Sequence, residues 1–205
     1  TRKQTVWASA VDDYENFEPG SNDDQSWTHT LLSGQANDIQ WLVSEKALLC
    51  GSTGDEWVIS SSKEDGIITP TNVRARRHSG NGSDDIAPIL IDDATVFVQR
   101  GGSVVRKMSY SFEADGYNTA DLTLLAEHIT GDGIVSMALQ SQPEQVIWAV
   151  TRDGRLIGLT LDEGQDVVGW HRHSTGTTDQ FEDVTVRKVK GQDDQIWVVV
   201  KRTIN

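Results

Sequence analysis

The chain has 205 residues, which is enough for one all-β domain of ordinary size. Asp and Glu outnumber Lys and Arg by 31 to 18, and the formal net charge of -13 excludes a typical nucleic-acid reader, because such a surface repels phosphates. No apolar run approaches the ~18 residues that a membrane helix needs. The chain begins without Met, at what resembles a strand, so we expect a fragment or a processed chain.

Short apolar runs alternate with turns rich in Gly, Asp, Asn and Ser along the whole chain, which predicts an all-β protein. Four of these runs follow a polar lead, and their starts are separated by 47, 48 and 50 residues. In chain order they are "DIQWLV" from Asp38, "DIAPILI" from Asp85, "GIVSMAL" from Gly133 and "DVTVRKV" from Asp183. This regular spacing indicates an internal repeat.

Each repeat continues with further predicted strands. The second strands are expected over 47–51, 95–99, 146–150 and 196–200, the third over 56–60, 103–110 and 155–161, and the fourth over 71–79, 121–130 and 167–175. The last repeat has only two strands before the chain ends. The segments "TVWASA" (5–10) and "SWTHTLLSG" (26–34) resemble a third and a fourth strand, so we expect them to complete it.

Four-stranded antiparallel units at a period of roughly 40–50 residues are the signature of a β-propeller. We therefore predict a single β-propeller domain over 1–205 with about four four-stranded antiparallel blades. The expected blades are 38–79, 85–130, 133–175, and 181–205 completed by 5–34. The alternative is an open arc, as a fragment of a larger propeller, and strand composition does not separate the two.

The order of several longer motifs resembles a family of tailed-bacteriophage structural proteins. The motifs are "TVWASAVDDYENFEPG", "GDEWVIS", "TPTNVRARRHSGNGS", "VFVQRGGSVVRKMSYSFEADGY", "DLTLLAEHITGDGI" and "QDVVGWHRHS". Together they are similar to the tail nozzle proteins (tail tubular protein B) of short-tailed phages, and to packaged-DNA stabilisation proteins. The resemblance spans nearly the whole chain. Members of that family are longer, and strands that normally precede "TVWASA" are absent here, which favours the interpretation as a fragment.

The resemblance implies a virion protein of the phage tail. Its partners would be other copies of itself in a ring and neighbouring tail proteins, and DNA would pass through the ring without sequence-specific binding. It implies no catalytic residue and no cofactor, so we expect that the chain is not an enzyme.

The histidines raise the question of a metal site. His171 and His173 stand two apart and would share one face of a strand, where two imidazoles could hold a metal ion with a carboxylate such as Asp166. A structural zinc site normally needs four ligands, and four cannot be assembled from the sequence. The favoured interpretation is structural, because His78, His128 and His173 recur at equivalent ends of the predicted fourth strands. His171 has no such counterpart.

The acidic pairs offer a second chemical hypothesis, since two carboxylates can serve as acid and base in glycoside hydrolysis. The pairs are Asp12–Asp13, Asp23–Asp24, Asp84–Asp85, Asp92–Asp93 and Asp193–Asp194. All fall in expected turns and no pair stands out, so we interpret them as solvated turns with weak Ca²⁺ binding as the lesser alternative. The single Cys50 lies among apolar residues and is expected to be a buried structural thiol.

The seven tryptophans are unusual for this length. Most should pack between blades, because they fall in strand-like runs. A surface tryptophan could instead stack on a sugar, so a propeller that binds a host-surface glycan or a partner protein is the alternative function.

Overall fold

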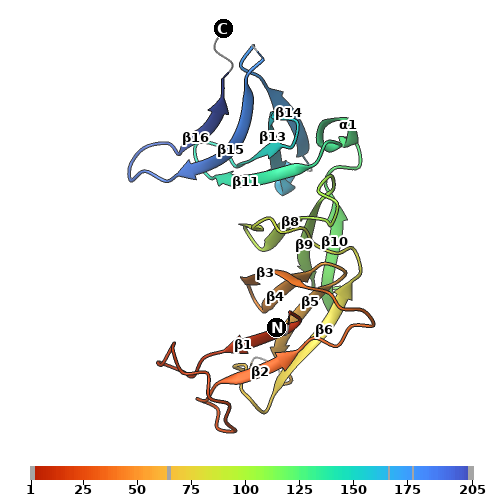
Figure 1. Ribbon diagram of the computed structural model, residues 1–205, viewed down its shortest axis with the longest axis vertical. Helices are drawn as coiled ribbons and strands as arrows, with labels where there is room; N and C mark the ends of the chain where they lie inside the picture. Colours follow the sequence, from red (N-terminus) through yellow and green to blue (C-terminus); the bar gives the residue numbers. More distant parts are fainter. Residues whose placement is uncertain (1–2, 64–65, 166, 177, 203–205) are drawn as a thin grey trace. The chain divides into compact units, whose positions relative to one another are not determined.

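The computed structural model describes residues 3–63, 66–165, 167–176 and 178–202. Its elements are almost all β-strands, which confirms the predicted all-β class (Figure 1). The chain divides into two compact units, 1–85 and 86–205. This division does not test the expectation of a single propeller domain over 1–205, which stays a prediction.

The first unit contains a two-stranded sheet and a four-stranded sheet. The two-stranded sheet joins β1 (Thr5–Ala8) and β2 (Trp27–Thr30). The four-stranded sheet has the order β3-β4-β5-β6, with β3 at Ile39–Ser44, β4 at Leu48–Ser52, β5 at Glu56–Ser61 and β6 at Val73–Ser79. All neighbours are antiparallel, and short hairpins join β3 to β4 and β4 to β5.

The second unit contains two four-stranded sheets and one two-stranded sheet. The first sheet has β7 (Ile89–Ile91), β8 (Ala94–Val98), β9 (Val105–Ser111) and β10 (Gly116–Asp121). The second has β11 (Ile134–Gln140), β12 (Val146–Thr151), β13 (Leu156–Asp162) and β14 (Val167–His173). The two-stranded sheet joins β15 (Gln180–Arg187) and β16 (Gln195–Lys201), and short helical turns are α1 (Glu127–Thr130) and the 3-10 turn Glu163–Gln165.

These sheets confirm the predicted repeat of four-stranded antiparallel units in chain order, an architecture consistent with a propeller-like arc. Tight turns lie where Gly and Asp were expected to provide them. Asp92 adopts a φ of 51° in the two-residue β7–β8 turn, and Gly154 a φ of 84° between β12 and β13. Both values lie in the left-handed region that hairpin turns use.

The strands of the predicted fourth blade form two two-stranded sheets. β15–β16 and β1–β2 are separate two-stranded sheets, and no hydrogen-bonded register joins them in the part of the chain that the structure describes. The completion of 181–205 by 5–34 therefore stays a prediction.

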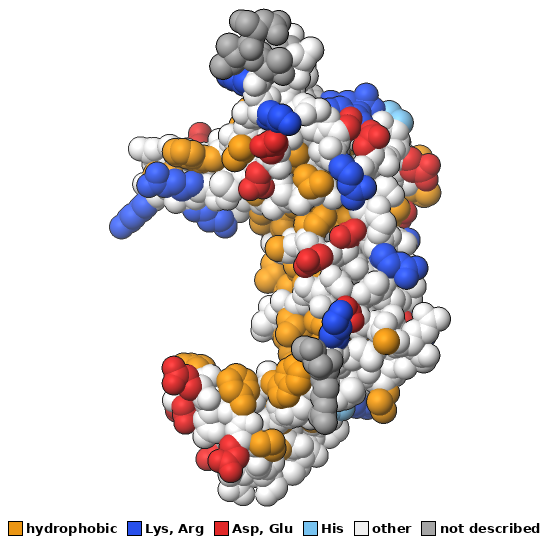
Figure 2. Space-filling view, in the orientation of Figure 1, with side chains coloured by type: hydrophobic (Ala, Val, Ile, Leu, Met, Phe, Trp, Pro, Cys, Tyr) orange, Lys and Arg blue, Asp and Glu red, His pale blue; other side chains and the backbone are white. Residues whose placement is uncertain are grey.

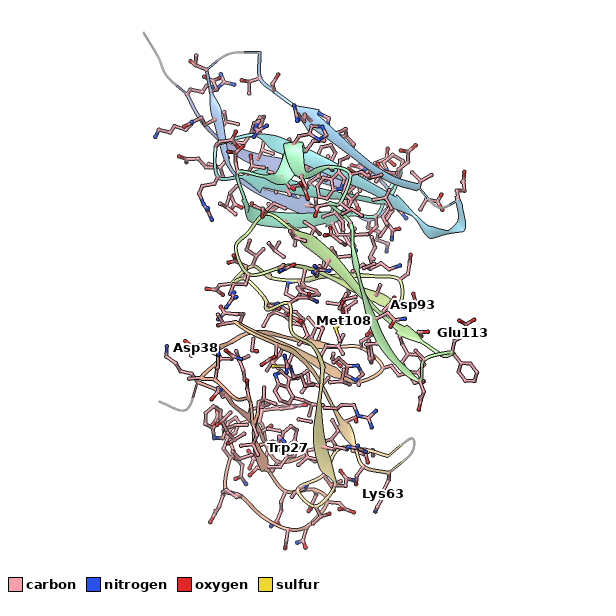
Figure 3. All side chains as sticks on the ribbon, turned by 90° about the vertical axis from the view of Figure 1, so that its right-hand side faces the viewer. Trp27, Asp38, Lys63, Asp93, Met108 and Glu113 are labelled. Carbon is pink, nitrogen blue, oxygen red and sulfur yellow. The ribbon has the colours of Figure 1, made fainter. Side chains whose placement is uncertain are left out.

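Each unit has its own apolar core. In the first unit, Val6 and Trp27 of the β1–β2 sheet pack with Cys50, Trp57 and Ile59 of the neighbouring sheet. In the second unit, one core joins the sheets β7–β10 and β11–β14, and a smaller one holds β15 on β11–β14 through Phe181 and Val184. Figure 3 shows Trp27 among the strands of the first unit, whereas Glu113 lies at the outer tip of the β9–β10 hairpin.

Cys50 is fully buried on β4, as the sequence predicted. Burial raises the pKa of its thiol to about 12, and the negative charge of Glu56 adds to the increase. A thiol with this pKa carries almost no thiolate at neutral pH, so it is a packing group and a poor nucleophile.

The prediction of a fourth strand over 121–130 is wrong. The fourth strand of this sheet is β10 at Gly116–Asp121, and the residues after it form turns and the short helix α1. Leu122, Ala126 and Ile129 are buried, whereas Leu124 and Leu125 are exposed. Buried residues at spacings of four and three follow the period of a helix and not the alternation of a strand.

Two hydrogen bonds hold this linking segment on β14. Trp170 Nε1 donates to the carbonyl of Leu122 at 2.8 Å, and Arg172 Nη2 donates to the carbonyl of His128 at 2.7 Å. Within the described residues, none of the helices is long and apolar enough to cross a membrane.

Candidate functional site

The structure brings His171 and His173 together on β14. The Nδ1 atom of His171 lies 2.8 Å from the Nε2 atom of His173, which is a hydrogen bond between the two imidazoles. Both rings also contact the indole of Trp148 on β12, with ring centroids at 5.6 Å from His171 and 4.9 Å from His173. The predicted sharing of one strand face by the two histidines is therefore observed, and a tryptophan two strands away completes the cluster.

Cross-strand register explains how His171 reaches Trp148. Gly158 on β13 lies opposite Trp148 on one side and opposite His171 on the other. A Cβ atom on Gly158 would lie 2.1 Å from His171 Cε1, so the imidazole occupies the space that a side chain would fill. The glycine therefore lets a ring on the edge strand cross β13 and contact the indole.

Burial lowers the pKa of His171, and the charge of the neighbouring His173 lowers it further. A neutral His171 can accept or donate in the bond to His173, whereas protonation of both rings would place two positive charges side by side. This geometry therefore favours the neutral form of His171.

The structure does not test metal binding by this cluster. Asp166, the carboxylate proposed with the two histidines, lies outside the described residues. Among those that are described, no group of three or more His, Cys, Asp or Glu side chains could hold a metal ion. Two imidazoles alone fall short of the ligand set of a structural zinc site.

The three histidines predicted at equivalent strand ends do not share one environment. His78 lies near the end of β6 and His173 is the last residue of β14, as predicted. His128 instead lies in α1, because the segment that contains it is not a strand. The equivalence is therefore wrong for His128, and a shared structural role of the other two stays a prediction.

The acidic pairs lie in turns and loops, and Figure 3 shows Asp93 at the β7–β8 turn. Asp92 lines an open groove of about 630 Å³ in the second unit, together with the carboxylates Glu144 and Asp162. Asp194 accepts hydrogen bonds from the backbone N–H groups of Ser141 and Gln142, at 2.7 and 3.2 Å, and so fastens the β15–β16 link to the preceding sheet.

Sequence reasoning missed two buried carboxylates at the start of β5. Asp55 is 3% exposed and Glu56 is fully buried. Asp55 accepts hydrogen bonds from Ser33 Oγ at 2.9 Å and Asn37 Nδ2 at 2.7 Å, and its other oxygen pairs with Arg77 Nε at 2.5 Å. The carboxylate therefore joins the β2–β3 link, β5 and β6 at one end of the sheet.

Glu56 has a similar role with hydroxyl donors. Its two oxygens accept hydrogen bonds from Ser79 Oγ and, at 3.0 Å, from Ser83 Oγ. The only signal in the sequence is "DEW", an acidic pair that leads directly into an apolar strand. Because Glu56 is closed to solvent and Asp55 nearly so, we interpret both as anchors for neighbouring loops.

Apolar side chains gather on the surface of β16. Ile196, Trp197, Val198 and Val199 have exposed fractions of 39%, 55%, 38% and 54%. Figure 2 shows hydrophobic side chains at the β15–β16 sheet. A continuous apolar strand at the surface is uncommon in soluble proteins and marks an interaction site.

Comparisons with known proteins give only weak structural likeness. No family model matches the chain, and no curated protein matches it. Among solved structures, the chain is similar to a luciferin-regenerating enzyme, with a TM-score of 0.35 and 10% sequence identity. The match covers 89% of this chain and 76% of that chain.

This match contradicts the expectation that the chain is not an enzyme, since the matched protein is named as one, and the expectation is withdrawn. At this TM-score and identity, the match assigns no reaction, substrate or catalytic residue to the chain.

Proposed function

We propose that the chain is a structural component of a bacteriophage tail, of the nozzle or tail-tube type. Its role would be to support the assembly of a ring and the retention and passage of DNA. The observation that carries the proposal is the recurrence of four-stranded antiparallel sheets in chain order, together with an order of sequence motifs that resembles tail nozzle proteins. Partners would be other copies of the chain and neighbouring tail proteins.

The charge of the chain supports this role. DNA carries one negative charge per ~1.7 Å of its axis, and a protein that neutralises phosphates binds it tightly. A net charge of -13, with acidic pairs on turns, instead repels the duplex. A tail wall of this kind would let DNA pass without adhering to it.

A module that binds a glycan is the second candidate, because Trp7 and Trp197 are about half exposed. Sugar sites combine an aromatic face with well-placed polar groups. The neighbours of Trp197 on the same strand are Ile196, Val198 and Val199, which are apolar. This surface therefore favours a protein partner over a sugar.

Immunogold labelling of virions of the encoding phage tests the proposal, with antibodies raised against the isolated chain. We expect gold particles at the tail end of the particle, and mass spectrometry of purified virions should detect peptides of the chain. Peptides absent from purified virions, or gold confined to the capsid surface, would contradict the proposal. Labelling at the tail together with glycan-array binding that Trp197→Ala abolishes would favour the second candidate.

A further inference from the structure

β12 and β16 occupy the same place in the repeat and have similar sequences, but only one of them is covered. Both are second strands and contain the pair Ile-Trp, at 147–148 and 196–197. In β12, Ile147 is 1% exposed. Its counterpart Ile196 is 39% exposed on β16. β16 therefore has an apolar sequence typical of a buried strand, although it lies at the surface.

Missing neighbours explain this difference. β12 pairs with β11 on one edge and with β13 on the other, whereas β16 pairs with β15 alone among the described strands. In β12, the face that carries Trp148 and Val150 packs against Phe181 and Val184 of β15. The equivalent face of β16 carries Trp197 and Val199, and both are more than half exposed. β16 therefore lacks a third strand at its edge and a sheet over its face.

The β1–β2 sheet lacks the opposite half of a blade. β1 pairs with β2 alone among the described strands, so its other edge has no strand partner over Thr5–Ala8; just before β1, the carbonyl of Lys3 accepts a hydrogen bond from the backbone N–H of Ile39 at 3.1 Å. One face of this sheet packs through Val6 and Trp27 on the sheet β3–β6, whereas Trp7 on the other face is 49% exposed. In the predicted repeat, β15 and β16 are a first and a second strand, and β1 and β2 are a third and a fourth. The two sheets together therefore have the four strands of a full blade.

Charge is complementary at the ends that antiparallel pairing would bring together. The connection from β1 to β2 (9–26) carries six Asp or Glu residues and no Lys or Arg. The end of β15 and the link to β16 carry three basic residues, Arg187, Lys188 and Lys190, and two acidic ones, Asp193 and Asp194. Figure 2 shows basic side chains at the tip of the β15–β16 hairpin. If β1 pairs antiparallel with β16, the C-terminal end of β1 lies beside the start of β16, so the connection with six acidic residues meets a stretch in which basic residues outnumber acidic ones by three to two.

We propose that the free edge of β16 binds β1 of a second copy of the chain. The four strands β15, β16, β1 and β2 would then form one antiparallel blade across two chains, with the sheet β3–β6 of the second copy covering Trp197 and Val199. Among the described strands, β15–β16 and β1–β2 are separate two-stranded sheets. The interface is head to tail, so each copy keeps one unused surface, and association continues into a ring or a filament.

This proposal goes beyond the proposed function, because it rests on sheet edges and exposed faces and holds whether or not the chain belongs to a virion. It also assigns the residues of the contact.

Sedimentation velocity on mixed variants tests the contact. Trp197→Lys places a charge on the β16 surface, and Trp7→Lys places one on the β1 surface; both side chains are about half exposed in the isolated chain, so both variants should fold. The unmodified chain should sediment as species larger than its 22.6 kDa mass. Each variant alone should be a monomer, since it keeps only one working surface. An equimolar mixture should form a dimer and nothing larger.

Leu125→Lys is the matched control, because Leu125 is 92% exposed in the same unit as β16 and lies away from that strand in sequence. This variant should associate as the unmodified chain does. Hydrogen exchange provides the second readout: the amides of β16 that do not face β15 should become protected in the unmodified chain as its concentration rises, and should stay unprotected in the monomeric Trp197→Lys variant.

Three results would overturn the proposal. A chain that stays monomeric at all concentrations with protected β16 amides would mean that it closes on its own β1. A monomer with unprotected β16 amides would mean that this edge has no partner. Association that survives both lysine substitutions would place the contact between copies elsewhere on the chain.

Discussion

At the scale of single residues, the cluster around Gly158 shows how one missing side chain positions three rings. His171 crosses β13 over this glycine and contacts Trp148, while its Nδ1 atom bonds to His173. Trp41 lies over Gly51 in the same way in the first unit, where an added Cβ would lie 2.1 Å from the indole. Close approach of an aromatic ring to a strand glycine is thus used in both units.

Gly158→Ala should displace His171 from Trp148 and destabilise the chain by about 1–3 kcal/mol, because the added methyl group needs space that the imidazole occupies. Chemical denaturation measures the free energy of unfolding. Gly169→Ala on β14 is the control, since its Cβ would meet no atom closer than 4.0 Å. Equal stability of the two variants would contradict the packing described for His171.

The lowered pKa of His171 predicts a pH dependence with a definite sign. The folded chain favours neutral His171, whereas the unfolded chain protonates it near the ordinary pKa of 6.5. Stability from this residue is therefore complete above that value and is lost as the pH falls through it toward the lower folded pKa. Denaturation between about pH 7.5 and pH 5.5 should show a decline that His171→Asn reduces and His29→Asn leaves intact. A decline of the same size in His171→Asn would contradict this role.

At the scale of elements, the segment between β10 and β11 distinguishes a helical turn from a strand. A strand over 121–130 would place Leu122 and Leu124 on the same face, because side chains alternate. In the structure, Leu122 is 8% exposed and Leu124 is 67% exposed. The linking segment is fixed on β14 by hydrogen bonds from Trp170 and Arg172 to its carbonyls.

Leu122→Ala should therefore cost about 2–4 kcal/mol of unfolding free energy, and Leu124→Ala less than about 0.5 kcal/mol. Thermal and chemical denaturation of the two variants measure this contrast. Similar losses of unfolding free energy from both substitutions would instead support the strand predicted from the sequence.

The sequence predicts most strands because alternating apolar residues and turns of Gly and Asp are local signals. It does not predict the linking segment that contains α1, whose helical pattern depends on only three buried apolar positions, 122, 126 and 129. The spacing of two predicts that His171 and His173 share a face, but their contact with Trp148 depends on the register of three strands. The burial of Asp55 and Glu56 depends on partners such as Ser33 and Ser79, 22 and 23 residues away along the chain.

At the scale of the whole molecule, the described strands form three four-stranded sheets and two two-stranded sheets. The four-stranded sheets bury their central strands. β16, in contrast, is an exposed apolar strand, and its sequence is similar to that of the buried β12. Exposed apolar side chains that a partner could bury therefore lie on β1 and β16, at the two ends of the repeat.

The net charge of -13 predicts that the chain does not bind duplex DNA at about 0.15 M salt. A mobility-shift assay with random duplex DNA should show free DNA at all protein concentrations tested. Replacing Asp12, Asp13, Asp23 and Asp24 with Asn leaves the net charge negative and should leave the result unchanged. A shifted band that weakens steeply with salt would contradict the account of DNA passage.

The most direct test of the proposed role is an electron cryomicroscopy map of the intact virion. The account predicts density at the tail end into which the sheets β3–β6, β7–β10 and β11–β14 fit as consecutive blades of subunits arranged around the tail axis. A map in which these sheets fit only density away from the portal–tail axis, or fit no virion density, would contradict it.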